Sequence, residues 1–109
     1  VWLKNATIED GRRIAREIRS PQVRTLGLQL GSEIQVSMNL ISPDEVGPDF
    51  VFDEIAKRAE IARAELVGLA PARVLAQIQK TRWTELDLSK EKTIEWCLAT
   101  RNRAIQNLD

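Results

Sequence analysis

The stretch from Val23 to Ile41, VRTLGLQLGSEIQVSMNLI, decides the fold of this 109-residue chain. Apolar residues alternate with polar residues or glycine on both sides of Gly31-Ser32, which is typical of two strands joined by a tight turn. We therefore predict a β-hairpin with two unlike faces. The aliphatic face is expected to hold Leu26, Leu28, Leu30, Ile34, Val36, Met38 and Leu40, and the uncharged polar face Thr25, Gly27, Gln29, Gln35, Ser37 and Asn39.

The residues before the hairpin predict a strand and a helix. Residues 1–4 are apolar at their start and suit a first strand. Thr7 with Asp10 three residues later is a helix-start pattern, in which a hydroxyl and a carboxylate cap the first turn. The helix is expected to run through Arg19, because Pro21 disfavours helix at the residue before it.

The residues after the hairpin predict a helix, a strand and two trailing helices. Pro48 suits the first position of a helix, whose apolar stripe continues to Ala62. Glu65 to Leu69 is predicted as the last strand, and a short helix starts at Pro71. Residues 81–88 are expected to be irregular, and Ser89 is expected to cap a final helix. The apolar stripe of that helix would consist of Ile94, Cys97, Leu98 and Ile105.

This order of elements predicts an α+β, ferredoxin-like βαββαβ sandwich. Right-handed crossovers place both main helices on one face of a four-stranded antiparallel sheet. We expect a single domain over residues 1–109, with the sandwich in residues 1–80 and a C-terminal extension with a helix in residues 81–109. The aliphatic face of the hairpin should meet the helices. The polar face would then lie on the other side of the sheet, where it is the candidate binding surface.

Composition narrows the function classes. Sixteen basic residues balance sixteen acidic ones, so no net field favours nucleic acid or an anionic membrane as a partner. The chain has no histidine, which excludes Ser-His or Cys-His catalysis and mixed His/Cys zinc sites for the chain alone. Cys97 is the only cysteine, which favours a reduced, cytoplasmic protein. Because the sequence begins at Val1 inside a predicted strand, we also expect a further portion upstream.

Two motifs around the second main helix resemble one enzyme family. QVSMNL (Gln35 to Leu40) and ELVGLAP (Glu65 to Pro71) are similar to segments of the C-terminal subdomain of glutamate formimidoyltransferase, the formiminotransferase domain of formiminotransferase-cyclodeaminase. The likeness extends from about Ile8 to Leu98. Its remaining parts are Val23, Leu26, Gly27 and Leu30 before the first motif, and Asp87, Lys90, Glu91, Ile94 and Glu95 near the end.

The resemblance implies a folate-dependent transferase. In that family two ferredoxin-like subdomains enclose a ligand tunnel between their sheets, and a formimino group moves from N-formimino-L-glutamate to N5 of tetrahydrofolate. The catalytic histidine lies in the N-terminal subdomain, so this chain resembles the folate-binding half and is not expected to be active alone. Matching by motif position implies folate contacts from Thr25, Gly27, Gln35, Ser37, Asn39, Glu65 and Gly68.

The implied partner is an N-terminal formiminotransferase subdomain, on the same or a separate chain. Neither a catalytic residue nor a metal ligand is assigned to this half. The chain departs from the family pattern at Arg63-Ala64, where Gly-Ser is usual, and at Trp2, where a small polar residue is expected. The alternative is a non-catalytic module of the same fold that binds another small ligand or forms a homodimer.

Overall fold

The computed structural model describes the backbone of residues 1–106 and the side chains of residues 1–103. The chain divides into two compact units, Val1–Glu65 and the residues from Leu66 on. The first unit contains β1 (Trp2–Lys4), α1 (Ile8–Ile18), β2 (Val23–Leu30), β3 (Glu33–Leu40), α2 (Pro48–Ala56) and β4 (Glu60–Arg63). The second contains α3 (Ala72–Ala76), the 3-10 turns η1 (Lys80–Arg82) and η2 (Lys90–Lys92), and α4 (Ile94–Gln106).

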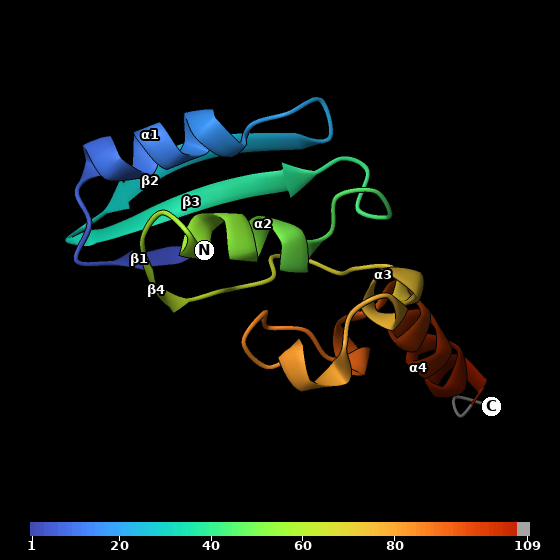
Figure 1. The fold of residues 1–109 in the computed structure, drawn as a ribbon. Coiled ribbons are helices and arrows are strands. Elements are labelled where there is room, and N and C mark those ends of the chain that lie inside the picture. Colours follow the sequence, from blue (N-terminus) through green and yellow to red (C-terminus); the bar gives the residue numbers. More distant parts are fainter. Residues whose placement is uncertain (107–109) are drawn as a thin grey trace. The chain divides into compact units, whose positions relative to one another are not determined.

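The first unit is a four-stranded sheet covered on one face by two helices (Figure 1). The strand order is β2-β3-β1-β4, and each neighbouring pair is antiparallel. This is the arrangement of the βαββαβ sandwich, so the predicted fold class is confirmed.

The start of α1 follows from its capping residues. The Thr7 hydroxyl accepts a hydrogen bond from the Asp10 backbone N–H (3.2 Å), and the Asp10 carboxylate accepts one from the Thr7 N–H (2.9 Å). This reciprocal capping box satisfies two backbone donors that have no partner within the helix. The helix ends at Ile18, three residues before Pro21.

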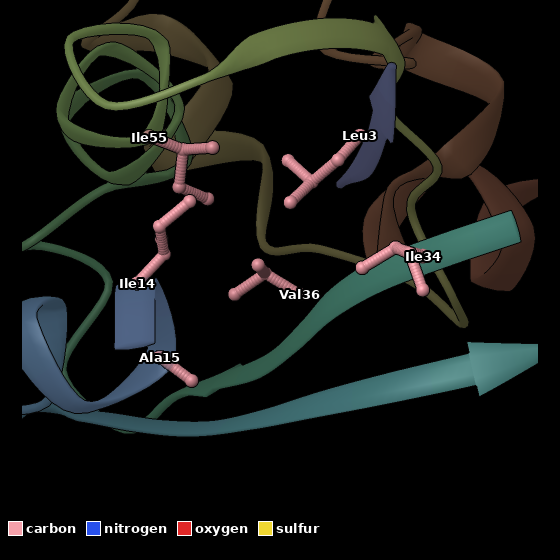
Figure 2. Packing of buried hydrophobic residues seen from close by; sticks show 6 residues of the cluster. All are labelled: Leu3, Ile14, Ala15, Ile34, Val36 and Ile55. Atoms are coloured by element: carbon pink, nitrogen blue, oxygen red, sulfur yellow. The ribbon is translucent and has the colours of Figure 1, made fainter. Parts of the chain in front are cut away.

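The core of the first unit lies between the sheet and the two helices. Figure 2 shows Ile14 of α1 and Ile55 of α2 directed toward each other above Val36 of β3. All three have a relative exposure of 0%. Burying an aliphatic side chain of this size contributes about 1.5–3 kcal/mol to folding, so each member of this cluster favours the folded unit.

The predicted ends of the second half of the sandwich were wrong. Helix α2 stops at Ala56 rather than reaching Ala62, and the last strand is Glu60–Arg63 rather than Glu65 to Leu69. Lys4 of β1 pairs with Glu60. The alanine- and arginine-rich segment suits a helix by local preference, but pairing with the free edge of β1 overrides that preference.

The second unit is built around α3 and the start of α4. Val74, Leu75 and Ile78 are buried, as predicted. The Thr93 hydroxyl accepts from the Trp96 N–H (3.2 Å) and so caps α4. Ser89 precedes η2 without a capping hydrogen bond, so its predicted role was wrong. In the predicted apolar stripe of the last helix, Ile94 and Leu98 are exposed and Cys97 is half-buried, while the Ile105 side chain lies outside the described residues.

Candidate functional site

The hairpin register determines which side chains share a face of the sheet. Leu26 lies opposite Ser37, and Leu28 lies opposite Gln35. Directly opposed residues in an antiparallel pair project from the same face. The prediction of one aliphatic and one polar face was therefore wrong, because each face combines one row from each strand.

The reason is the length of the turn. Leu30 and Glu33 are opposed across the two-residue turn Gly31-Ser32. With two turn residues, even positions of β2 lie opposite odd positions of β3. The three leucines of β2 therefore share a face with the polar row of β3, away from the helices.

The candidate functional site is the face of the sheet opposite the two helices of the first unit, which we call the open face. Its β2 row is Arg24, Leu26, Leu28 and Leu30, and its β3 row is Glu33, Gln35, Ser37 and Asn39. Trp2 and Arg63 continue this face across β1 and β4, because Trp2 lies opposite both Gln35 and Arg63. Trp2 itself is buried, with 8% exposed.

The open face combines apolar and uncharged polar groups at its centre. Leu26 is 57% exposed and Leu30 is 51% exposed. Gln35 and Ser37 are half-exposed and Asn39 is exposed. Among the described residues no side-chain hydrogen-bond partner is found for these three polar groups. Such a surface can cover a flat ring with leucine side chains and offer amide and hydroxyl groups to the ring edge.

Two of the residues predicted to bind folate lie on the opposite, helix-covered face. Thr25 is 8% exposed, and its hydroxyl donates to the Ala15 carbonyl of α1. Gly27 lies against the backbone of α1, where a Cβ would stand 2.7 Å from the Gly11 carbonyl carbon. The predicted position of Thr25 and Gly27 on the exposed polar face was wrong. They hold α1 close to the sheet.

A charged cluster at the β1–β4 side of the open face was not predicted as part of a site. The Arg63 guanidinium lies 4.4 Å from the centre of the Trp2 ring and forms an ion pair with Glu33 (2.9 Å). The Trp2 indole N–H donates to the Glu65 carboxylate (3.3 Å). Trp2 and Arg63 are both positions at which the sequence departs from the pattern of the family that it resembles. The contact between Arg63 and Trp2 could not be predicted from the sequence, because it depends on how β4 pairs with β1.

The remaining predicted residues are divided between the two units. Glu65 closes the first unit beside Trp2, as described above. Gly68 belongs to the second unit, where it is exposed and has a positive φ of 84°. The structure brings Gln35, Ser37 and Asn39 into one row but does not bring all seven predicted residues together.

A shallow pocket of about 220 Å³ lies elsewhere in the first unit, away from the open face. Its charged lining residues include Asp10 and Arg13, which pair with each other at 3.5 Å. Capping hydrogen bonds from Thr7 hold the pKa of Asp10 below its ordinary value. Because Asp10 serves to cap α1, its presence in the lining is explained by the helix and not by a ligand.

Within the described part of the chain, no group of three or more Asp, Glu, Cys or His side chains is placed to hold a metal ion. No described helix is long and apolar enough to cross a membrane. Comparison with protein-family models, with curated proteins and with solved structures gave no match.

Proposed function

We propose that the open face binds a folate-type ligand, and that the chain is the folate-binding half of a formimidoyltransferase-like protein. Such a protein moves a formimino group from N-formimino-L-glutamate to tetrahydrofolate. The observation that carries the proposal is the row Gln35, Ser37 and Asn39, three uncharged hydrogen-bonding side chains on a sheet face that no helix of the first unit covers. The motif likeness described for the sequence supports the same ligand class.

The chemistry of the open face suits the parts of a reduced folate. Amide and hydroxyl groups can match the donor and acceptor pattern of a pterin edge, while Leu26 and Leu28 lie beside them for the apolar ring faces. Arg24 lies at the end of the same face, opposite Asn39, and supplies a positive charge for a carboxylate tail. Thr25 and Gly27 are not proposed contacts, because α1 covers them.

The proposed role of this half is binding and orientation. Formimino transfer requires a base near the attacking amine and correct placement of the two substrates. The chain has no histidine to act as that base. We therefore assign the base to an N-terminal formiminotransferase subdomain, with the open face forming one wall of the shared ligand site.

Calorimetric titration with 5-formyltetrahydrofolate tests this proposal. The chain alone, or the chain mixed with a histidine-containing N-terminal formiminotransferase subdomain, should bind the ligand. Asn39→Leu should weaken binding by about tenfold or more, because it removes a polar group whose loss leaves ligand atoms unpaired. The control Glu45→Leu changes an exposed loop residue outside the open face and should leave affinity unchanged. No binding with either preparation, or equal affinity for Asn39→Leu, would contradict the proposal.

A second candidate function is a non-catalytic module that dimerises through the open face. The observation that favours it is the exposure of Leu26 and Leu30 on that face. Sedimentation velocity distinguishes the two functions. A dimer that Leu26→Gln and Leu30→Gln dissociate, together with no folate binding, supports the module; a monomer that binds folate supports the transferase half.

A further inference from the structure

Strand β2 forms one edge of the sheet, because β3 is its only strand neighbour among the described residues (Figure 1). It is 8 residues long, contains no proline and pairs with β3 without a register shift. Edge strands are usually protected by proline, bulges or short length, because their free backbone groups can pair with another chain. β2 has none of these three protections, and in the described chain only Val23 at its start is already paired with another backbone, that of Ser20 (3.1 Å), so the free part of the edge begins after it.

The hydrogen-bond pattern identifies the backbone groups that point outward from this edge. The Ile41 N–H donates to the Gln22 carbonyl (2.8 Å), so positions 22 and 41 form a hydrogen-bonded pair. Such pairs alternate along an antiparallel ladder, so Thr25, Gly27 and Gln29 direct their N–H and C=O groups away from β3. Among the described residues no partner is found for the outward groups of Gly27 and Gln29.

A row of arginines on α1 runs beside this edge. The helix crosses directly over β2, since a Cβ on Gly27 would stand 2.7 Å from the Arg12 backbone nitrogen. Arg12 and Arg16 follow at i and i+4 on one side of α1, and Arg19, the C-cap residue just after the helix, continues the row. The Arg19 guanidinium donates to the outward Thr25 carbonyl (2.9 Å), which fixes this side of α1 next to the edge.

Two arginines of this row have no ion-pair partner in the part of the chain that the structure describes. Arg12 and Arg16 are exposed, and neither has an ion-pair partner among the described residues. The acidic Glu17 points elsewhere, since it pairs with Arg58 beside α2 (2.8 Å). Exposed Glu9 lies one turn before Arg12 on this side of α1, so Arg12 and Arg16 together leave a net positive charge on the helix side of the edge.

On the open-face side, the β2 edge is flanked by apolar and not by charged side chains. Leu26 and Leu30 project from the open face of β2 and are about half exposed. A strand added beside β2 would place alternate side chains on the two sides of the sheet. One set would lie near the arginines of α1 and the other near these leucines.

We propose that β2 binds an extended acidic peptide segment as a fifth strand, with acidic residues on the side of Arg12 and Arg16 and apolar residues on the side of Leu26 and Leu30. Backbone hydrogen bonds to Gly27 and Gln29 anchor the segment, and the alternation of its side chains provides specificity. A second copy of this chain is a poor occupant, because pairing two β2 edges about a twofold axis places two arginine rows beside each other. This inference does not depend on the proposed folate function.

The test uses a capped peptide of 8 residues, the length of β2, in which glutamate and valine alternate. Two control peptides replace every glutamate by lysine, or group the same residues into a glutamate block and a valine block. Titration of the ¹⁵N-labelled chain, followed by amide chemical shifts, should show saturable binding of the alternating acidic peptide alone. The shifts should centre on Thr25 to Leu30, and hydrogen exchange at the Gly27 and Gln29 N–H groups should slow.

Two sets of variants separate charge from backbone pairing. The double variant Arg12→Glu, Arg16→Glu should lower the affinity by about tenfold or more, since it places like charges against the peptide. Gln29→Pro removes one outward N–H at a position where an edge strand tolerates proline, and it should also weaken binding about tenfold. The matched control Gln29→Ala loses the same side-chain hydrogen bond to the Gly31 carbonyl but keeps the N–H, and it should bind like the parent.

Circular dichroism and thermal melting confirm that each variant is folded. Three results would overturn the proposal: no saturable binding at about 1 mM alternating peptide, equal binding of the block or lysine peptide, or equal binding by Gln29→Pro and Gln29→Ala. A concentration-dependent dimer with protection at Gly27 would also overturn it, in favour of a second copy as the occupant.

Discussion

Gly27 of β2 and Gly11 of α1 are in direct backbone contact, and no side chain separates the helix from the strand at this point. A Cβ on Gly27 would lie 2.7 Å from the Gly11 carbonyl carbon and 2.7 Å from the Arg12 nitrogen. This approach brings α1 close enough for the Thr25 hydroxyl to reach the Ala15 carbonyl. It also brings the arginine row of α1 beside the edge of the sheet.

The first prediction concerns this contact. Gly27→Ala should lower the free energy of unfolding by about 1–3 kcal/mol, because the added methyl group meets backbone atoms that cannot rotate away. Urea denaturation measures the change. Gln29→Ala, two residues along the same strand and exposed, should change the value by less than about 0.5 kcal/mol. Equal stability of the two variants would show that α1 can move away from β2 at little cost.

The second prediction concerns the buried hydroxyl of Thr25. Thr25→Val keeps the shape of the side chain but removes its hydrogen bond to Ala15, and it should lower the free energy of unfolding by about 1 kcal/mol or more. Thr25→Ser keeps the hydroxyl and tests how much of the effect comes from the methyl group. Folate affinity should not change in Thr25→Val. A loss of folate affinity without a loss of stability would indicate that Thr25 contacts the ligand.

The third prediction separates the two faces of the hairpin. Leu26→Gln should leave the unfolding free energy within about 0.5 kcal/mol of the parent value, because the side chain is 57% exposed on the open face. Val36→Ala should lower it by about 2 kcal/mol, because Val36 is fully buried under the helices. Chemical denaturation of both variants gives the comparison. A large cost for Leu26→Gln would mean that the open face is covered in solution.

The fourth prediction concerns the pH dependence of the α1 cap. Hydrogen bonds from the Thr7 backbone and side chain lower the pKa of Asp10 from its ordinary value of 3.8. The ionised carboxylate therefore contributes stability that is fully present above pH 3.8 and is lost as pH falls through the lowered pKa. Asp10→Asn should be less stable than the parent at neutral pH, and the difference should shrink below pH 3.8. A difference that stays constant with pH would contradict this role of the charge.

The fifth prediction concerns the second unit. Asp87 accepts hydrogen bonds from the Lys92 ammonium and from the Leu66 N–H (2.9 Å), and the Lys92 bond is the main reason that its pKa is lowered. Asp87→Asn keeps a residue that tolerates the positive φ of 58° but removes the charge. It should destabilise the second unit by about 1 kcal/mol or less, since the pair is partly exposed. Hydrogen exchange at the Leu66 N–H should become faster, whereas exchange at Val36 in the first unit should not change.

Some features of the fold were determined by local sequence alone. The Thr7 and Asp10 pair is sufficient to start α1, because a capping box involves only residues three apart. The hairpin could be predicted from the sequence, because the alternation of apolar and polar residues and the Gly31-Ser32 turn are also local features. The two-residue turn also fixes the opposition of Leu26 and Ser37, which the hydrophobic pattern alone does not reveal.

Other features were decided by tertiary structure. Residues 60–63 form a strand only because β1 offers a free edge to pair with, and nothing in their own sequence specifies that partner. The same holds for Arg63 stacking on Trp2, which depends on the register of β4 against β1. Thr25 and Gly27 became structural rather than exposed residues because α1 packs on them. The sequence by itself thus determined the order of the elements, the start of α1 and the hairpin, while packing between distant segments decided where β4 lies and which side chains the open face and the β2 edge present.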